Sequence, residues 1–522
     1  MAQGSRAGRG GQSWRLAWLV FAFVLVAPRA APAESDMQPA VEEDVNANIP
    51  AEPDSFWSRK TMTGDWGGLR AWLSAQGVNI NLNYTSEFLD NVQGGIKQGG
   101  VYEGLLLGQV DVDLAKLIGW QGASFHISTM SVEGEPEGHG LTNGYVGSLL
   151  TVSNIEAAPT EKIYTVWLQQ VADAGAVSLR LGVLGIDDEF MIRPTSQLFL
   201  GNTFAGVTND LPAGGATYPL AAPAVRLAWK PLPQVTWMNA VFDGDPTGGD
   251  GSTFIDEQQP SGTLFSFSGG VFVISELDVA TFALPSAPAA PLVVKFGSWY
   301  DSGTHFASLR YDSQGISLAS PDSNGEPRNH VGDWGAYGVA DWPLYRLHAG
   351  SDQGVSAFLR ASVSPSDENL VDRFADGGIV EKGLIPARPA DLFGVEFAYS
   401  HVSSAERDFD LAERTYVNPE YPLANYEFQL EETYQVQITK WWALQPDIQE
   451  YFRPWRQCCE PQWQFAQKRA GDGHAPDRLV LNSARNRRSR AAVTWLYRAA
   501  QTQAEMRRSH DGDNSSFLRM YE

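Results

Sequence analysis

The chain has 522 residues, 51 glycines, 11% aromatic residues and a formal net charge of −23, a composition that suits many strands joined by many turns. Beyond the N-terminus no run of 18 or more apolar residues occurs, which excludes a helical membrane span, so a membrane protein with this sequence has to be a β-barrel. The acidic body argues against nucleic-acid binding, and two cysteines, Cys458 and Cys459, cannot provide a disulfide framework for the main domain.

The first 33 residues are typical of a secretory signal peptide. Arginines precede the short apolar core Leu16–Val26, and Ala31-Pro32-Ala33 has the small-x-small pattern of a cleavage site. An uncleaved anchor is disfavoured because the apolar core is short. We therefore expect export with cleavage near Ala33, followed by a flexible acidic leader, rich in proline, glutamate and aspartate, over residues 34–56.

A short N-terminal helical segment is expected at residues 57–77. Leu69, Trp72 and Leu73 are spaced i, i+3, i+4, as on one face of a helix. Gly77 follows at the place where a helix commonly ends on a residue in the left-handed region.

From residue 78 onward the period of the apolar residues changes from 3.6 to 2. In residues 78–85, four apolar side chains alternate with three asparagines and a threonine, as expected for a strand between lipid and a wet lumen. Similar alternation recurs at residues 109–114, 164–170, 177–183, 225–229, 294–296, 355–363, 395–399 and 426–438. We therefore predict an all-β fold, a transmembrane antiparallel β-barrel of about 16 strands over residues 78–454, with the short helix before its first strand. The segment Asp301–Asp333 is expected to be a long polar loop.

Enzyme and metal motifs have weaker support than their structural alternatives. Residues 243–250 have the acidic and glycine-rich character of a calcium loop, but position 12 is Phe254 instead of a bidentate glutamate, so a turn is the better interpretation. The eight histidines form no zinc motif. Asp187-Asp188-Glu189 contains candidate catalytic carboxylates, but a loop of solvated charges is the simpler interpretation. We expect no enzyme activity, no metal and no cofactor.

The same residues carry a family resemblance. Trp57-Ser58-Arg59 and the run Thr63–Arg70 resemble the opening of the carbohydrate-selective porins of the OprB family, with the signature residues Gly64, Asp65, Trp66, Gly67, Gly68 and Arg70. Further matching blocks follow in chain order: Asn83–Glu87, Val101–Gly104, Leu149–Glu156, Leu168–Gln170, Asp187–Phe190, Tyr218–Ala221, Val241–Pro246, Pro365–Leu370, Thr433–Gln437 and Trp441–Asp447. The resemblance implies an outer-membrane barrel, surrounded by lipid, that passes sugars such as glucose by diffusion, without enzyme activity or a cofactor.

If the apolar face of each strand meets lipid, the other face meets the lumen. This assignment turns ten side chains inward as candidate sugar-binding residues: Glu87, Glu103, Asp111, Asp113, Trp167, Arg180, Arg226, Lys295, Arg360 and Glu396. Trp167 is the aromatic candidate for stacking on sugar rings. Each of the ten either lines the sugar path or braces the wall through ion pairs, and the sequence leaves both roles open.

The chain departs from the porin pattern after Pro454. Residues 455–522 are basic and lack the alternation that precedes them. Back-translation of Trp455–Trp463 with one base dropped gives an ordinary turn sequence, Gly-Gly-Asn-Val-Ala-Asn-Pro-Asn-Gly. We interpret residues 455–522 as an aberrant basic tail created by a frameshift near Pro454, with a genuine tail as the alternative. The tail is then expected to form no strand, which leaves the barrel with an open edge in lipid.

A soluble periplasmic protein, β-rich and either carbohydrate-binding or active on glycosides, is the alternative to the porin. A folded outer-membrane barrel migrates anomalously on an unboiled gel and shifts on heating, whereas a soluble protein does not. The sequence leaves open the preferred sugar, the residues of the constriction and the choice between monomer and trimer.

Overall fold

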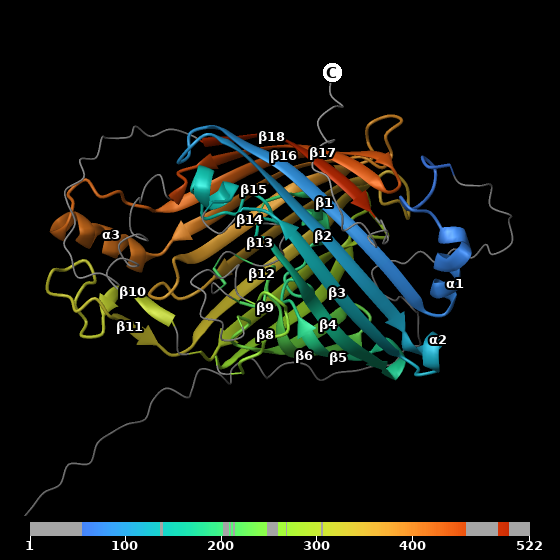
Figure 1. The fold of residues 1–522 in the computed structure, drawn as a ribbon, viewed down its shortest axis with the longest axis horizontal. Helices are drawn as coiled ribbons and strands as arrows, with labels where there is room; N and C mark the ends of the chain where they lie inside the picture. Colours follow the sequence, from blue (N-terminus) through green and yellow to red (C-terminus); the bar gives the residue numbers. More distant parts are fainter. Residues whose placement is uncertain are drawn as a thin grey trace, which may run out of the picture. The chain divides into compact units, whose positions relative to one another are not determined.

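The computed structural model describes residues 55–135, 139–201, 208, 210–211, 215–247, 259–267, 269–303 and 306–455, together with the backbone of Ser489–Ala500. Among these residues, sixteen antiparallel strands form one closed barrel (Figure 1). Each strand pairs with its neighbours along the chain, except that β9 pairs with β12 and that β18 pairs with β1. The strands are β1 (Val78–Gln93), β2 (Gly99–Asp113), β3 (Ala123–Glu133), β4 (Thr160–Ala172), β5 (Val177–Leu184), β6 (Ala222–Leu232), β7 (Val235–Asp243), β8 (Val271–Ala283), β9 (Pro291–Asp301), β12 (Asp333–Arg346), β13 (Gly354–Val363), β14 (Val371–Lys382), β15 (Leu392–Val402), β16 (Tyr426–Thr439), β17 (Trp442–Phe452) and β18 (Ser489–Ala500). The expected signal peptide and nearly all of the acidic leader lie outside the described residues.

The two ends of the barrel differ in the length of their connections. Short turns, such as residues 173–176 and 440–441, join strands at one end, which we name the short-turn end. Long connections, such as residues 185–221 and 403–425, join strands at the other, the long-loop end. The helices α1 (Leu69–Ala75) and α2 (Leu114–Ile118) lie at the short-turn end, and α3 (Ser404–Tyr416) lies at the long-loop end (Figure 1).

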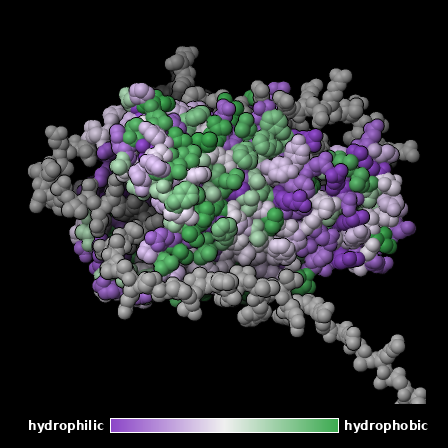
Figure 2. All heavy atoms as spheres, turned by 180° about the vertical axis from the view of Figure 1, so that it is seen from behind, coloured by the Kyte–Doolittle hydropathy of each residue, from purple (hydrophilic) through white to green (hydrophobic). Residues whose placement is uncertain are grey.

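The strand register separates an inward face from an outward face. Phe88 of β1 lies opposite Tyr102 of β2, and these side chains are 52% and 48% exposed. Glu87, which precedes Phe88, lies opposite Glu103, which follows Tyr102, and both glutamate side chains are buried. Partners in a register share a face, so the apolar phase faces outward and the polar phase faces the lumen. Apolar residues accordingly gather over the strands on the face seen in Figure 2.

The N-terminal helical segment is a 3-10 turn, η1 (Trp66–Gly68), followed by α1. Gly77 ends it with a φ of +86°, in the left-handed region expected from the sequence. A side chain could not fit there, because a Cβ on Gly77 would lie 2.7 Å from the carbonyl oxygen of Asp113. No helix within the described residues is long and apolar enough to cross a membrane.

The segment expected as a long polar loop, Asp301–Asp333, contains two strands outside the barrel. They are β10 (Phe306–Asp312) and β11 (Pro327–His330), which pair as a two-stranded sheet. The Asp312 carboxylate organises the turn between them by accepting hydrogen bonds from the amides of Gln314 at 2.9 Å and Ile316 at 2.8 Å. Local side chain–backbone bonds of this kind order a polar segment that has no apolar pattern.

The expectation that the tail forms no strand is wrong for Ser489–Ala500. This segment forms β18, which pairs with β17 on one side and with β1 on the other and closes the barrel. The physical reason is the hydrogen-bonding requirement of β1 and β17, whose edges would otherwise meet lipid unpaired. The run between Arg490 and Arg498 carries no charge and can therefore serve as the partner. The rest of the tail after Trp455 lies outside the described residues.

Two buried acids on α3 predict a pH dependence of this helix. Burial, with the neighbouring Asp410, raises the pKa of Glu406 to about 8, and burial raises the pKa of Asp410 to about 7. The folded helix thus keeps protons that the unfolded chain loses near pH 4, so a rise in pH from about 4 to about 8 progressively favours unfolding of α3.

We expect amide hydrogen exchange in residues 404–416 to be faster at pH 9 than at pH 6 after correction for the intrinsic rate. Glu406→Gln, which stays neutral, should reduce this difference. Equal protection at both pH values in the unaltered protein would contradict the prediction. The exposed residue Glu420 provides the control, since Glu420→Gln should leave the pH dependence unchanged.

Candidate functional site in the barrel lumen

Two connections from the long-loop end fold into the lumen. The first inner segment is residues 139–159, between β3 and β4, and the second is the described part of residues 185–221, between β5 and β6. Leu150 of the first is fully buried in an apolar cluster with Phe374 of β14 and Tyr451 of β17, across the barrel. The two segments meet where the amide of Asn154 donates to the carbonyl oxygen of Leu200 at 2.7 Å.

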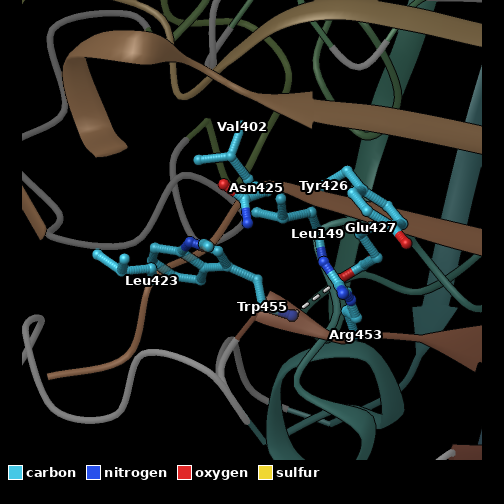
Figure 3. Close-up of a pocket in the computed structure, with 9 residues that line it drawn as sticks. Leu149, Val402, Leu423, Asn425, Tyr426, Glu427, Arg453 and Trp455 are labelled. Atoms are coloured by element: carbon cyan, nitrogen blue, oxygen red, sulfur yellow. Dashed lines mark hydrogen bonds between the residues drawn. The ribbon is translucent and has the colours of Figure 1, made fainter. Parts of the chain in front are cut away.

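The first inner segment is held by a glutamate on the barrel wall. The carboxylate of Glu427 on β16 accepts hydrogen bonds from the amides of Leu149 at 2.9 Å and Leu150 at 2.7 Å. It also accepts from the amide of Trp455 at 2.9 Å, drawn as the dashed line in Figure 3. The cavity beside it measures about 10 Å³, room for one water at most and too small for a sugar. This part of the lumen is therefore an anchor.

The second inner segment is held in the same way. Glu431, two inward positions further along β16, accepts from the amides of Leu200 at 2.7 Å and Gly201 at 2.9 Å. Wall carboxylates thus satisfy backbone donors of a segment that has no ladder partner of its own. Two further wall acids repeat the arrangement: Glu276 of β8 accepts from the amide of Met191 at 2.7 Å, and Asp341 of β12 accepts from the amide of Thr195 at 2.9 Å.

A buried ion group secures the middle of the second inner segment. Arg193 Nη1 lies 2.7 Å from one oxygen of Asp376 on β14, and Arg360 Nη2 of β13 lies 2.5 Å from the other. All three side chains are fully enclosed. Removing one partner of such a group leaves a buried charge without its counter-charge, so each member is structurally required.

A second polar group lies on the lumen wall between β2 and β6 and keeps contact with water. It contains an aromatic centre, Trp167 of β4, and we name it the Trp167 cluster: Asp111, His126, Trp167, Arg180, Glu189 and Arg226. The His126 ring stacks on the Trp167 ring at 4.8 Å and 10°, while the Arg180 guanidinium lies 3.8 Å from its centroid. Because His126 comes from β3 and Arg180 from β5, the indole is held between its two neighbours.

The charges of the Trp167 cluster are paired around one acid of the second inner segment. Glu189 lies 2.6 Å from Arg180 Nη1 and 2.5 Å from Arg226 Nε. On the other side of the indole, Asp111 Oδ1 lies 2.6 Å from His126 Nδ1. Asp111 is the most open of these groups, with its side chain 45% exposed, against 16% for Arg180 and 14% for Glu189.

The turn that leads from β5 to Glu189 is also acidic. Asp187 accepts a hydrogen bond from the amide of Tyr218 at 2.9 Å, and Asp188 accepts from the amide of Gly185 at 3.2 Å. Burial and the adjacent Asp188 raise the pKa of Asp187 to about 8, against the opposing hydrogen bond from Tyr218. These acids bind backbone amides and thereby fix the start of the second inner segment.

The barrel and its inner segments agree with a comparison to known families. The family described as "Carbohydrate-selective porin, OprB family" matches residues 97–475. The chain belongs to the OprB family. The match ends at residue 475, past Pro454, and β18 lies beyond that end. The frameshift near Pro454 stays a prediction, which resequencing of the locus would test.

Individual relatives of this OprB-family chain support the assignment. Porin B of Pseudomonas aeruginosa is 26% identical over 428 residues, covering 77% of this chain and 88% of that protein. The high-pH structure of Pseudomonas putida OprB shares the fold, with a TM-score of 0.71 at 21% identity, covering 86% of this chain and 100% of that chain. The chain is thus an outer-membrane porin, a channel and not the soluble periplasmic alternative. Its short-turn end is periplasmic and its long-loop end extracellular.

The ten side chains expected in the lumen of this porin divide by exposure. Four of them, Asp111, Trp167, Arg180 and Arg226, belong to the Trp167 cluster. Lys295 pairs at 3.1 Å with both Glu276 and Asp278. Four are exposed by 2% or less, which favours the bracing role over contact with sugar: Glu87, Glu103, Arg360 and Glu396. Asp113 instead caps α2 at the periplasmic end, where it accepts from the amide of Ala115 at 2.9 Å.

Several functional side chains were missed from the sequence. His126 of the Trp167 cluster was not named as a site residue, nor were Glu427 and Glu431, which hold the inner segments. Glu189 was named only as a solvated loop charge, whereas its side chain is 14% exposed and pairs with Arg180 and Arg226. Glu427 and Glu431 stand on the polar phase of the clearest alternating run, so the alternation alone could have placed them inward. No local pattern identified His126, because a single histidine between apolar residues can be either a site residue or a structural residue of a strand.

One group outside the lumen has metal-ligand residue types. The ligand atoms of His330, Asp367 and Glu368 at the extracellular end lie within 4.8 Å of one another. His330 presents Nε2 to Asp367 at 2.7 Å but Nδ1 to Glu368 at 3.9 Å. An ion bound by one ring nitrogen would face away from the carboxylate at the other, so this geometry suits contacts of the two ring nitrogens with separate acids better than a metal site.

Proposed function

We propose that sugars diffuse passively through the lumen of this porin and are selected at the Trp167 cluster by hydrogen bonds to their hydroxyl groups. The observation that carries the proposal is the open carboxylate of Asp111 beside the partly exposed Arg180 and Glu189. Carboxylates accept hydrogen bonds and a guanidinium donates them, so this wall offers both partners that neighbouring sugar hydroxyls need. Glucose and similar sugars fit this chemistry.

The expected stacking of a sugar on Trp167 is not part of the proposal. With His126 on one side of the indole and Arg180 on the other, the ring offers its edge to the lumen. Trp167 therefore positions the two polar side chains that flank it. Their fixed spacing lowers the entropic cost of binding a hydroxyl pair.

In this proposal the inner segments narrow the lumen beside the cluster. They fill part of the lumen from the side of β13 to β17 and supply Glu189 to the opposite wall. A narrowed lumen would bring a crossing solute close to the wall side chains, and such contacts give a channel its selectivity.

Asp111→Ala tests the proposal in liposomes loaded with the purified porin. A hydrogen bond to a charged group contributes about 1.5 kcal/mol or more, so the glucose concentration at half-maximal flux should rise about tenfold. Conductance in potassium chloride should change little, because the width of the path is set by the inner segments.

The matched control is Asp173→Ala, which removes an exposed acid from the periplasmic turn between β4 and β5. It should leave glucose flux unchanged. If Asp111→Ala transports glucose as the unaltered porin does, sugars do not use this wall and the proposal fails. Arg180→Ala is a second variant for the same flux measurement. It differs from Asp111→Ala because it also breaks the ion pair with Glu189.

A further inference from the structure

The segment before the first strand exposes an unusual number of large apolar side chains. Trp57 is 64% exposed, Trp72 58%, Leu69 49% and Phe56 41%. Leu69 and Trp72 are three residues apart in α1 and so share one helix face. Single exposed apolar side chains are ordinary, but a short segment that carries four of them points to a binding surface.

This segment is joined to the lipid-facing surface of the barrel through an aromatic contact. The Phe56 ring lies 4.8 Å from the Trp441 ring, and Trp441 Nε1 donates to the carbonyl oxygen of Phe56 at 3.1 Å. Trp441 in turn stacks on Trp442. Trp442 stands on the outward phase of β17, the phase of Ile448, which is 48% exposed to lipid.

The contact lies at the level of an aromatic girdle. Outward side chains at the periplasmic ends of other strands include Trp229 at 45% exposure, Phe282 at 57% and Phe393 at 42%. Aromatic residues concentrate at the two membrane–water interfaces of such barrels, where an amphipathic ring meets headgroups. The segment therefore begins at the height of the inner leaflet.

The charge of the segment differs in sign from that of the chain. Residues 55–77 contain Arg59, Lys60 and Arg70 against one acid, Asp65, in a chain whose net charge is −23. Arg59 lies 4.6 Å from the Phe56 ring, and Arg70 lies 4.6 Å from the Trp66 ring. Basic side chains interleaved with aromatic ones are typical of segments that lie on an anionic lipid surface.

We propose that residues 56–75 form a lipid anchor on the inner leaflet of the outer membrane. Trp57, Leu69 and Trp72 enter the boundary between headgroups and acyl chains, and the basic side chains contact the phosphates of anionic phospholipid. The anchor continues the girdle of the barrel beyond its wall and fixes the tilt of the chain as it enters β1.

Spin labels on the full-length porin test this anchor. Cys458→Ser and Cys459→Ser remove the native thiols, and single cysteines are then placed by Trp57→Cys, Trp72→Cys and Leu69→Cys, with Ser74→Cys as the control on the opposite face of α1. In bilayers of phosphatidylethanolamine and phosphatidylglycerol, the collision rate with oxygen should exceed that with a water-soluble nickel complex at 57, 69 and 72. The order should reverse at 74.

The outcomes separate the possible occupants. Labels at 57, 69 and 72 that collide with nickel as often as the label at 74 would show that the segment stays in water and would overturn the proposal. Labels shielded from both reagents would show that protein covers the segment, which would also overturn the proposal. Spin–spin broadening would identify the covering protein as a second copy of the porin, and its absence would indicate the acidic leader. Leu69→Cys keeps the test valid if either tryptophan variant fails to fold. Replacing phosphatidylglycerol by phosphatidylcholine should reduce the oxygen preference, since the anionic headgroup is part of the proposal.

Discussion

Leu82→Arg should reduce the yield of folded porin far more than Asn83→Arg. The two residues are neighbours on β1, but Leu82 shares the outward phase of Phe88 and Asn83 shares the inward phase of Glu87. An arginine that faces lipid near the midplane costs about 2–4 kcal/mol, whereas one in a wet lumen costs much less. The measurement is the fraction of membrane protein that runs as the compact, heat-modifiable band on an unboiled gel.

The pair of variants is its own control, because both introduce the same charge and the same volume one residue apart. Equal yields would show that β1 does not separate lipid from lumen in this register. A lower yield for Asn83→Arg would reverse the assignment of the two faces. Either result would contradict the barrel register at its first strand.

Glu431→Leu should release the second inner segment from the wall and widen the path. The substitution removes the acceptor of two buried amides, those of Leu200 and Gly201. Each buried donor left unsatisfied costs about 1–3 kcal/mol, and the segment avoids this cost when it moves into the lumen water, where the amides can donate hydrogen bonds to water. We expect larger and noisier single-channel conductance in planar bilayers and loss of discrimination between small and large sugars.

Glu432→Gln is the matched control for this variant. Glu432 is the next residue of β16, faces outward and is exposed, so its replacement should leave conductance unchanged. If Glu431→Leu keeps the conductance and sugar selectivity of the unaltered porin, the second inner segment is held mainly by other contacts, such as the ion group of Arg193, Asp376 and Arg360.

The strands that show alternation in the sequence were predictable because each of them carries its signal locally. The alternating run of residues 426–438 corresponds to β16, Tyr426–Thr439, and that of residues 355–363 lies within β13, Gly354–Val363. Lipid on one side and water on the other impose a period of two on every wall strand, whatever its neighbours are. The strand number expected from chain length, about 16, agrees with the closed barrel, because the thickness of the membrane sets a similar length for every strand.

The inner segments were not predictable, because their partners are distant in the sequence. Leu150 binds Glu427 across 277 positions, and Leu200 binds Glu431 across 231. A buried irregular segment has no period, and the glutamates that hold it look like any other lumen residue. The same limit applies to the Trp167 cluster, where Asp111 and Arg226 come from separate strands and only the barrel brings them near one another.

The helix α3 and the strand β18 were missed for a different reason. In α3 the buried positions include the acids Glu406 and Asp410, so the inward face is not apolar. In β18 the arginines at 490 and 498 hide a short uncharged run whose role is set by the edges that it satisfies. The contacts with the surrounding structure therefore determine the conformation of both elements more than their own residue patterns do.

The junction of β1 with β18 has a consequence for the order of folding. All other barrel pairs join strands that follow one another, directly or across the β10–β11 insertion, so they can form as local hairpins soon after synthesis. The last junction joins opposite ends of the chain and bears the largest loop-closure entropy, which makes it the slow step. Until it forms, the sheet has two unpaired edges that can pair with other chains. Time spent as an open sheet, and not the stability of the finished barrel, is therefore what limits how much of this porin escapes aggregation.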